Sequence, residues 1–297
     1  MIGYLMCEQK KRVAVVWSNR SEEGLLRPVI EELKKSDHFE VEEWKIPDDV
    51  YGVAEYVAQL ERSDAELPDL AITPHDRPPV TLMAFFLYHV NVPLVQLHAG
   101  DISSGTFDDS DRWCISLWAK YHFCAGKIQA KRLRKFLRSM GKDPLHVYVS
   151  GVTNLDNLSK MSEPPDGDYD MVLYNPPTTA QEGITEELTK IINLLDKDTY
   201  WFAPNGDPGS ERIESAVKIL AKEKNIKWTA TMPHESFLGL LSRAKRVIGN
   251  SSTLFFEAPH FGCEIIQIGE RNRVRENVEL KPGGSKRIVR RLEKWLN

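Results

Sequence analysis

The sequence alternates between short apolar runs and longer amphipathic stretches, and this alternation limits the fold more than any other feature. Short apolar runs are typical of buried strands, and apolar residues spaced three or four apart are typical of helices. Strands that alternate with helices form parallel sheets covered by helices on both faces. In the first half the predicted strands are Val13–Trp17, Leu70–Thr73, Pro93–Leu97, Tyr121–Cys124 and Val147–Val149, and the predicted helices are 25–35, 50–62, 80–89, 110–120 and 128–140.

The second half repeats the pattern. Segment 160–168 (KMSEPPDGD) is polar and rich in Pro and Gly, which predicts a linker. We therefore expect an α/β protein with a domain over 1–162, a domain over 163–283 and a cleft between them. A last helix over 284–297, capped by Ser285, has an apolar face that could dock back onto the first domain. The predicted strands here are 171–174, 200–202, 227–229, 246–249 and 264–268, and the predicted helices are 185–195, 210–223, 234–244 and 253–260.

The composition narrows the function classes. Of the 297 residues, 41% are hydrophobic and 28% are charged, which is ordinary for a globular protein. The net charge of −4 argues against a non-specific nucleic-acid binder, because such proteins carry a basic excess. No apolar run is long enough for a signal peptide or a membrane span, so we expect a cytoplasmic protein without membrane contact. Four scattered cysteines, with no metal-ligand spacing, predict free thiols and no metal site: Cys7, Cys114, Cys124 and Cys263.

The strongest chemical signal is the segment 247–253 (VIGNSST), in which an apolar strand enters a small polar turn before a helix. Backbone N–H groups and the helix dipole would face this turn, and the hydroxyls of Ser251 and Ser252 add donors, so phosphate is the expected guest. The alternative is plain N-capping of the helix by one of the two serines.

Two further side chains follow that turn. Glu257 in the next helix suits a pair of adjacent sugar hydroxyls, as on a ribose, or is an ordinary exposed helix carboxylate. Arg271 follows the next strand and so lies at the carboxyl edge of the sheet, where ligands bind; the alternative is a surface salt bridge.

Several acids and a histidine follow strands of the first domain. Asp76, His98, Asp101 and Asp108 all lie at or just after predicted strand ends, and their convergence on one edge would suit acid/base chemistry. Asp108 could equally cap the next helix. Arg20 follows the first strand and could reach an anion.

These motifs resemble the UDP-N-acetylglucosamine 2-epimerase family along nearly the whole chain. The resemblance rests on Gly249-Asn250-Ser251-Ser252, on Glu257-Ala258-Pro259 with Phe261-Gly262, and on the pair Asp76-Arg77. Segments 105–112 (GTFDDSDR) and 204–210 (PNGDPGS) are most similar to the hydrolysing branch, which supplies N-acetylmannosamine for sialic acid synthesis. The resemblance implies two Rossmann-like domains in a GT-B arrangement, with UDP held mostly by the second. It implies conversion of UDP-N-acetylglucosamine to UDP and N-acetylmannosamine, with no cofactor, by a homodimer.

The resemblance also implies roles for particular residues. Asp76, His98, Asp108 and Arg112 would form the catalytic group. Ser251 and Ser252 would hold the diphosphate, Glu257 the ribose hydroxyls, and Arg271 the uridine or a phosphate. The remaining contacts to the nucleotide sugar are expected from Arg20, Arg77 and Asn175.

The sequence departs from the family pattern at two of these places. Asn175 stands where the His-Pro-x-Thr motif has its histidine, and Pro78-Pro79 stand where an acidic residue usually follows the Asp-Arg pair. The stretch between the first helix and Asp76 is also shorter than in typical members. Three alternatives follow: a relative that acts on another UDP-sugar, a protein that binds UDP-sugar without turning it over, and, more distantly, a glycosyltransferase.

Overall fold

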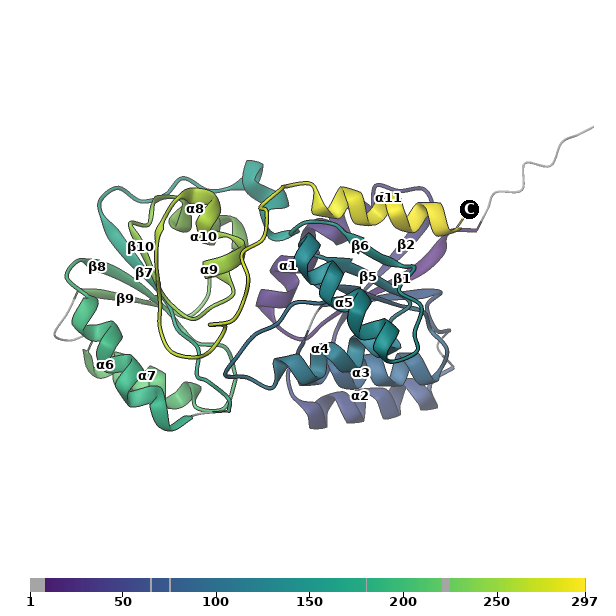
Figure 1. Cartoon of the computed structure of the whole chain (residues 1–297), viewed down its shortest axis with the longest axis horizontal. Helices are drawn as coiled ribbons and strands as arrows, with labels where there is room; N and C mark the ends of the chain where they lie inside the picture. Colours follow the sequence, from purple (N-terminus) through teal and green to yellow (C-terminus); the bar gives the residue numbers. More distant parts are fainter. Residues whose placement is uncertain (1–8, 65, 75, 180, 221–224, 297) are drawn as a thin grey trace, which may run out of the picture. The chain divides into compact units, whose positions relative to one another are not determined.

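The computed structural model describes residues 9–64, 66–74, 76–179, 181–220 and 225–296, and the chain forms two compact units (Figure 1). Unit 1 comprises the residues up to Gly100, Ser110–Thr153 and the residues from Lys281 onward. Unit 2 comprises Asp101–Asp109 and Asn154–Leu280. The sequence places the boundary at residue 162, whereas the chain changes unit after Thr153 and the segment 101–109 joins unit 2.

Unit 1 contains a six-stranded parallel sheet in the order β2-β1-β3-β4-β5-β6. This is the flavodoxin-like order of a doubly wound sheet, with one further strand at the β6 edge. Its strands are β1 (Lys11–Trp17), β2 (Phe39–Lys45), β3 (Leu70–Thr73), β4 (Leu94–Leu97), β5 (Tyr121–Cys124) and β6 (Val147–Val149). Its helices are α1 (Arg20–Leu33), α2 (Val50–Arg62), α3 (Pro78–His89), α4 (Asp108–Trp118), α5 (Lys127–Ser139) and α11 (Gly284–Leu296). The first two residues of α4, Asp108 and Asp109, are part of unit 2.

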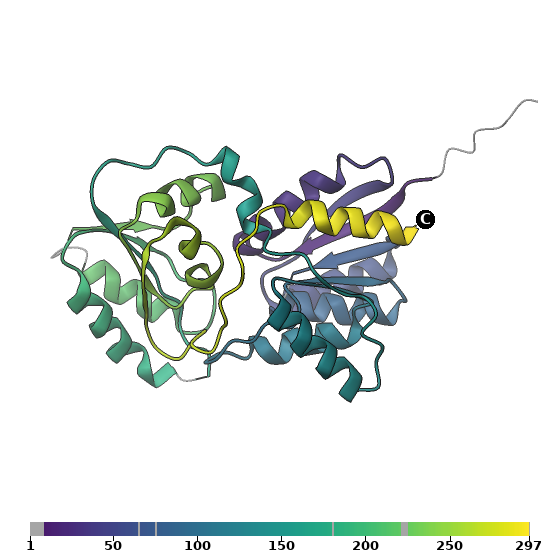
Figure 2. The ribbon, with the colours of Figure 1, turned by 45° about the horizontal axis from the view of Figure 1, so that its top comes forward.

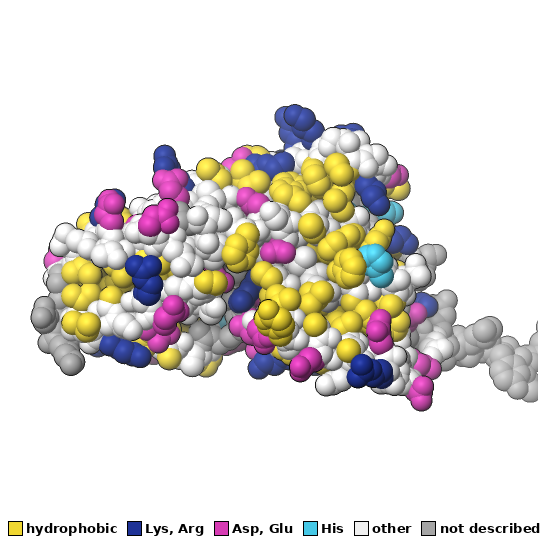
Figure 3. Space-filling model, turned by 90° about the horizontal axis from the view of Figure 1, so that it is seen from below, with side chains coloured by type: hydrophobic (Ala, Val, Ile, Leu, Met, Phe, Trp, Pro, Cys, Tyr) yellow, Lys and Arg dark blue, Asp and Glu magenta, His cyan; other side chains and the backbone are white. Residues whose placement is uncertain are grey.

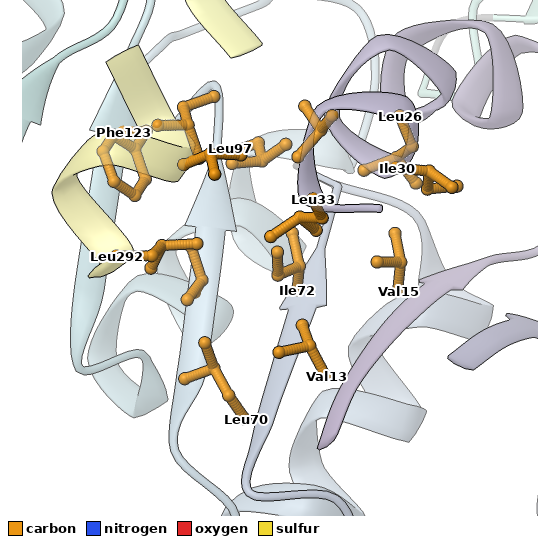
Figure 4. Close-up of a cluster of buried hydrophobic side chains, with 14 of the residues drawn as sticks. Val13, Val15, Leu26, Ile30, Leu33, Leu70, Ile72, Leu97, Phe123 and Leu292 are labelled. Carbon is orange, nitrogen blue, oxygen red and sulfur yellow. The ribbon is translucent and has the colours of Figure 1, made fainter. Parts of the chain in front are cut away.

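The strands of unit 1 send alternate residues to two apolar cores, as a pleated strand must. In β1, Val13 and Val15 pack toward α1 and α11, whereas Ala14 and Val16 pack toward α2, α3 and α4. Figure 4 shows the first core, where Leu26 and Ile30 of α1 lie over the strands. Helices on both faces of a parallel sheet are what the strand–helix alternation predicts.

The C-terminal helix α11 belongs to unit 1 (Figure 2). Its residues Ile288, Val289 and Leu292 are buried in the same core as α1, and Trp295 stacks on Tyr121 with 3.8 Å between the ring centroids. Burial of each aliphatic side chain contributes about 1.5–3 kcal/mol, which fixes the helix against the sheet. The helix begins at Gly284, two residues earlier than a cap at Ser285 requires.

Unit 2 contains a five-stranded parallel sheet in the order β11-β10-β7-β8-β9, the order of a dinucleotide-binding fold. Its strands are β7 (Tyr169–Leu173), β8 (Asp198–Phe202), β9 (Ile226–Thr229), β10 (Arg246–Gly249) and β11 (Glu264–Gln267). Its helices are η1 (Asn154–Lys160), η2 (Gln181–Gly183), α6 (Ile184–Leu194), α7 (Ser210–Leu220), α8 (His234–Arg243), α9 (Thr253–Phe256) and α10 (Ala258–Phe261). The expected α/β class with two Rossmann-like domains is confirmed.

Three expectations differ from the structure. Strand β2 is absent from the sequence-based assignment. The segment 160–168 is part of unit 2, because Ser162 donates its backbone N–H to the Glu235 carbonyl at 3.1 Å. The single helix expected over 253–260 is split into α9 and α10. Residues 221–223 of the predicted helix 210–223 lie outside the described part of the chain.

Two other features can be stated for the described residues. None of their helices is both long and apolar enough to cross a membrane. Cys114, Cys124 and Cys263 are free thiols, and Cys7 lies outside the described residues.

Candidate functional site: the loop edge of unit 2 and an acidic pair in unit 1

The strand order of unit 2 reverses between β7 and β10, and ligands of open α/β sheets bind beyond the carboxyl ends of the strands at such a point. Gly249 ends β10 with a φ of +141°, and a Cβ there would lie 2.2 Å from the Leu173 carbonyl oxygen. Only glycine therefore lets the chain leave β10 this close to β7. The predicted phosphate-binding turn starts at this glycine.

Asn175 and Asn250 join the loops that follow β7 and β10. The Asn175 N–H donates to Asn250 Oδ1 at 2.8 Å, and Asn250 Nδ2 donates to the Asn175 carbonyl at 2.9 Å. Asn175 Oδ1 also accepts the Asn205 N–H at 2.8 Å, and the Asn250 carbonyl accepts Asn272 Nδ2 at 2.7 Å. The loops after four strands are thus tied together by asparagine side chains. Asn250 belongs to the motif 249–252, but its role in joining the loops is not predicted from the sequence. The available signal is an Asn between a strand-ending Gly and a Ser.

The two serines of the turn differ in their contacts. Ser251 Oγ accepts the Thr253 N–H at 3.3 Å, which is the capping alternative, whereas Ser252 makes no side-chain cap bond to α9. Both serines are half-buried. Helix α9 is only four residues long, so its dipole is much smaller than that of the helix expected over 253–260. The backbone N–H groups of Asn250 and Ser251 already donate to the Leu173 carbonyl, at 3.0 and 3.2 Å. An anion at this turn would therefore depend mainly on the donors of Ser252.

Glu257 lies at the break between α9 and α10. Pro259 explains the break, since it has no N–H to donate to the Phe255 carbonyl and its ring would clash with that group in a continuous helix. Glu257 is only 4% exposed, which overturns its reading as an exposed helix carboxylate. Its Oε1 accepts Asn154 Nδ2 at 2.9 Å and lies 3.7 Å from His234 Nε2. No side chain of the described residues bonds Oε2.

Arg271 follows β11 and is 6% exposed. Its NH1 donates to the Pro176 carbonyl at 2.6 Å and to Asp207 Oδ2 at 2.7 Å, and its NH2 lies 3.8 Å from Asp108 Oδ2. Arg271 is therefore an internal clamp between loops of unit 2 rather than half of a surface salt bridge. Asp207 is not among the predicted site residues, although its position just beyond β8 is a signal for such a role.

Asp108 lies in unit 2, not in the N-terminal domain where the sequence places it. The cause is the backbone pairing of its segment: the Gly105 carbonyl accepts the Thr178 N–H at 3.0 Å, and the Ser104 carbonyl accepts the Asn272 N–H at 3.0 Å. Gly105 has a φ of +68°, and a Cβ there would lie 2.9 Å from the Arg271 nitrogen. These contacts place the Asp108 carboxylate beside Arg271.

Tyr174 adds a protonated donor to the same loop edge. Its hydroxyl donates to Glu187 Oε2 at 2.6 Å. Burial, and then the hydrogen bond to the Glu187 carboxylate, raise the pKa of Tyr174 far above its usual value. The phenol therefore stays protonated at neutral pH.

In unit 1 the structure pairs Asp76 with Arg112. The Arg112 guanidinium donates to Asp76 Oδ2, and the two side chains are 0% and 6% exposed. The Arg112 carbonyl accepts Gln96 Nε2 at 3.0 Å and Ser116 Oγ at 2.9 Å, which fixes this part of α4. Arg112 is completely buried, so its side chain contacts protein groups such as Asp76 and not solvent.

The other predicted residues of unit 1 lie near the ends of β1, β3 and β4. His98 is 2% exposed and has a φ of +50°, a left-handed conformation that is rare outside glycine and is concentrated at functional sites. Arg77 NH2 lies 3.2 Å from Asp48 Oδ1, which also accepts Ser18 Oγ at 2.9 Å. Arg20 is the first residue of α1, and its side chain is outside the described part of the structure.

The structure thus brings the predicted residues into two groups. Asn175, Ser251, Ser252, Glu257 and Arg271 lie on the loop edge of unit 2, together with Asp108. Asp76, Arg77, His98 and Arg112 lie in unit 1. Within the described residues no three His, Cys, Asp or Glu side chains are placed to hold a metal ion.

Known proteins share this sequence pattern. The profile of the UDP-N-acetylglucosamine 2-epimerase family matches residues 51–297. A UDP-N,N′-diacetylbacillosamine 2-epimerase (hydrolyzing) from Legionella pneumophila is 24% identical over 228 residues, which are 72% of this chain and 59% of that protein. A UDP-N-acetylglucosamine 2-epimerase from Neisseria meningitidis is 29% identical over 191 residues, 59% of this chain and 48% of that protein. The chain spans about half to three-fifths of the length of the curated relatives it matches.

Solved structures share the fold. The UDP-GlcNAc 2-epimerase from Neisseria meningitidis bound to UDP-GlcNAc has a TM-score of 0.70 at 14% identity, over 96% of this chain and 91% of that one. The enzyme from Methanocaldococcus jannaschii in complex with UDP-GlcNAc and UDP has a TM-score of 0.70 at 17% identity, over 96% and 93%. Because the family profile covers most of its length, this chain belongs to the UDP-N-acetylglucosamine 2-epimerase family.

Proposed function

We propose that this chain is a hydrolysing UDP-sugar 2-epimerase, which converts UDP-N-acetylglucosamine to UDP and N-acetylmannosamine. Family membership and the hydrolysing relatives support the reaction class. The observation that carries the proposal is the buried Glu257 carboxylate, set directly after the Ser251–Ser252 turn at the strand-order reversal of unit 2. A turn rich in donors followed by a carboxylate acceptor fits a diphosphate joined to a ribose.

The nucleotide would bind along the loop edge of unit 2. Ser252 makes no cap bond, so its hydroxyl can donate to a phosphate oxygen. The contacts of Glu257 fall on Oε1, so Oε2 can accept from the ribose hydroxyls. Arg271 is already bonded to Asp207 and to the Pro176 carbonyl, and its contribution would be to position the loops and add positive potential. Arg20 and Arg77 would add cations from unit 1.

The chemistry follows from the substrate. The hydrogen on carbon 2 of the sugar has no adjacent carbonyl to acidify it, so a base cannot simply remove it. The bond from carbon 1 to UDP must break first or in the same step, and donors at the loop edge would stabilise the charge that develops on the leaving UDP. The oxocarbenium-like sugar then loses its carbon 2 proton, which leaves a glucal. Water adds across the double bond with the opposite stereochemistry at carbon 2, and N-acetylmannosamine is released.

Three groups are candidates for the proton transfers. Asp76 is a carboxylate held in place by Arg112, which would keep its orientation fixed. His98 is a buried imidazole in a left-handed backbone conformation at the end of β4, and imidazole is the side chain most often used for proton transfer. Asp108 is a half-buried carboxylate beside Arg271. Arg112 would act through Asp76 rather than on the sugar.

A second candidate, a protein that binds UDP-sugar without turning it over, is favoured by one observation. Asn175 replaces the family's histidine, and its side-chain oxygen already accepts the Asn205 N–H at 2.8 Å. An amide cannot change its charge as UDP departs. The chain could also act on a UDP-sugar other than UDP-N-acetylglucosamine, because the residues proposed on the loop edge would contact the nucleotide and not the sugar.

The test is incubation with UDP-N-acetylglucosamine, with detection of free UDP and of the released sugar. We expect both products from the unmodified chain. The Asp108→Asn variant should release UDP about 10²–10⁴-fold more slowly, the usual effect of losing an acid or base. Its affinity for UDP should stay within about threefold, because Asp207 still holds Arg271. Binding of UDP without any turnover would support the second candidate instead.

We propose that the active form is a homodimer, supported by an aromatic patch on unit 1. Figure 3 shows hydrophobic side chains gathered on the face that carries α2, α3 and α4. Phe85 and Tyr88 of α3 are 46% and 39% exposed, and both rings contact the Trp118 ring. Exposed aromatic clusters of this kind mark interfaces. Phe85→Glu should halve the mass measured by light scattering, and a monomeric unmodified chain would contradict the proposal.

The free thiols and the use of a nucleotide sugar support a cytoplasmic location.

A further inference from the structure

A basic groove lies between the edge strand β6 and helix α11 of unit 1, away from the predicted nucleotide residues. Its volume is about 320 Å³, at the lower end of the range for small-molecule sites. Phe123, Tyr148 and Val149 form its apolar wall. The remaining wall consists largely of cations: Arg134, Arg287, Arg290, Arg291 and Lys294.

Two of these cations already donate hydrogen bonds to backbone carbonyls of the protein. Arg134 NH2 donates to the Val147 carbonyl at 2.6 Å. Arg287 Nε donates to the Ser150 carbonyl at 2.5 Å, and its NH2 donates to the Lys281 carbonyl at 3.0 Å. These bonds fix two guanidinium groups at the wall of the groove, so part of the site is rigid before any ligand arrives.

The other three cations are not neutralised within the described residues. Arg291 lies over the Tyr148 ring, 4.3 Å from its centroid. The side chains of Arg290 and Lys294 are exposed and form no ion pair with any described residue. No described Asp or Glu lines the groove. Gathering five like charges around one concavity is unfavourable without a counter-ion, and a bound anion would remove that cost.

We propose that this groove binds a small phosphorylated metabolite, a phosphate ester or diphosphate, at a site separate from the one proposed for the UDP-sugar. Guanidinium groups match phosphate oxygens two at a time, which favours phosphate over a carboxylate of lower charge. The apolar wall and the small volume favour a compact organic phosphate over a long polyanion. The ligand would also contact Arg287, whose guanidinium donates to the carbonyls of Ser150, Lys281 and Pro282. These residues lie close to the places where the chain passes between the units.

Calorimetric titration with inorganic pyrophosphate tests the site on the full chain. The double variant Arg290→Glu with Lys294→Glu changes only exposed side chains of α11, so it should fold. It should bind pyrophosphate about tenfold more weakly or worse, the loss of at least one charge-assisted contact. The matched control is Lys286→Glu, which changes the charge of the same helix outside the groove and should leave the affinity within about twofold.

Four outcomes would overturn the proposal. Equal weakening in Lys286→Glu would show a general charge effect. Unchanged affinity in the double variant would place the pyrophosphate elsewhere, and loss of its binding in Ser252→Ala would locate it at the proposed nucleotide site. The unmodified chain could also sediment with phosphatidylserine vesicles without binding pyrophosphate. If the double variant then loses the sedimentation, the groove is a membrane contact instead.

Discussion

Asn175 and Asn250 bond each other twice, the backbone N–H of Asn175 to Asn250 Oδ1 at 2.8 Å and Asn250 Nδ2 to the Asn175 carbonyl at 2.9 Å. The buried side chain of Asn250 thereby satisfies both backbone polar groups of Asn175, its N–H and its carbonyl. The pair fixes the two loops between which the strand order of unit 2 reverses. The geometry of the proposed nucleotide site therefore depends on an amide whose two hydrogen bonds are made within the protein.

The Asn250→Ala variant tests that dependence. It leaves the Asn175 N–H and carbonyl without their partner, at a cost of about 1–3 kcal/mol. We expect the melting temperature to fall by roughly 2–10 °C and UDP affinity to fall with it. Asn225→Ala, at an exposed asparagine of the same unit, is the control and should change the melting temperature little. Equal, small shifts in both variants would mean that the pair does not stabilise the loops.

Asn175 itself can be given the imidazole that the family pattern has. A histidine ring nitrogen at that position could still accept the Asn205 N–H, and it could carry a proton as UDP leaves. We expect Asn175→His to release UDP from UDP-N-acetylglucosamine at a similar or higher rate. Asn175→Ala, which strands the Asn205 N–H, should be slower. If the unmodified chain is inactive and Asn175→His is active, the natural site is degenerate; if Asn175→His alone loses activity, the amide has a role that imidazole cannot fill.

Glu257 is expected to recognise the ribose diol, and the 2′-hydroxyl can be removed from the ligand. The unmodified chain should bind UDP about tenfold more tightly than 2′-deoxy-UDP, the effect of one hydrogen bond to a charged group. In Glu257→Gln, which keeps an oxygen for Asn154 Nδ2, that preference should shrink to about threefold or less. Glu264→Gln, at an exposed carboxylate, should keep the full preference. A preference that survives in Glu257→Gln would remove Glu257 from the ribose site.

The sequence predicts the interior of this fold well and its edges less well. Buried apolar runs such as Tyr121–Cys124 and Arg246–Gly249 are predicted with correct ends, because burial on both faces leaves a continuous signal. Strand β2 (FEVEEWK) is missed, because an edge strand carries charges that hide its apolar alternation.

Site residues are likewise predictable from the sequence only where the signal is local. The turn 249–252 is predicted, since Gly and small polar residues after a strand are a local signal. The buried state of Arg112 and the position of Asp108 in unit 2 are not, because they depend on contacts with Asp76 and Arg271, distant in sequence. The break between α9 and α10 at Glu257 could have been predicted from Pro259, because proline interrupts a continuous helix.

Buried His122 makes unit 1 sensitive to acid. Its Nε2 lies 2.9 Å from the Ser116 carbonyl, and burial lowers its pKa below the ordinary 6.5. The unfolded chain therefore takes up a proton at a pH where the folded chain does not. Stability is present in full above pH 6.5 and is lost as the pH falls from 6.5 through the lowered pKa of the folded state.

Melting curves between pH 7.5 and pH 5 check this effect. The His122→Gln variant keeps a donor for Ser116 but cannot be protonated, so its melting temperature should fall less over this range than that of the unmodified chain. His38→Gln, at an exposed histidine, should behave like the unmodified chain. Identical pH profiles for all three proteins would show that His122 is not the group responsible.

The central claim is elimination of UDP followed by hydration, and turnover of UDP-N-acetylglucosamine in D₂O tests it most directly. The proton lost from carbon 2 exchanges with solvent, and the proton added on hydration comes from solvent. Mass and NMR spectra of the released sugar should therefore show N-acetylmannosamine with deuterium at carbon 2, in equal amount to UDP. N-acetylglucosamine without deuterium, released with UDP, would mean simple hydrolysis at carbon 1 and would contradict the account.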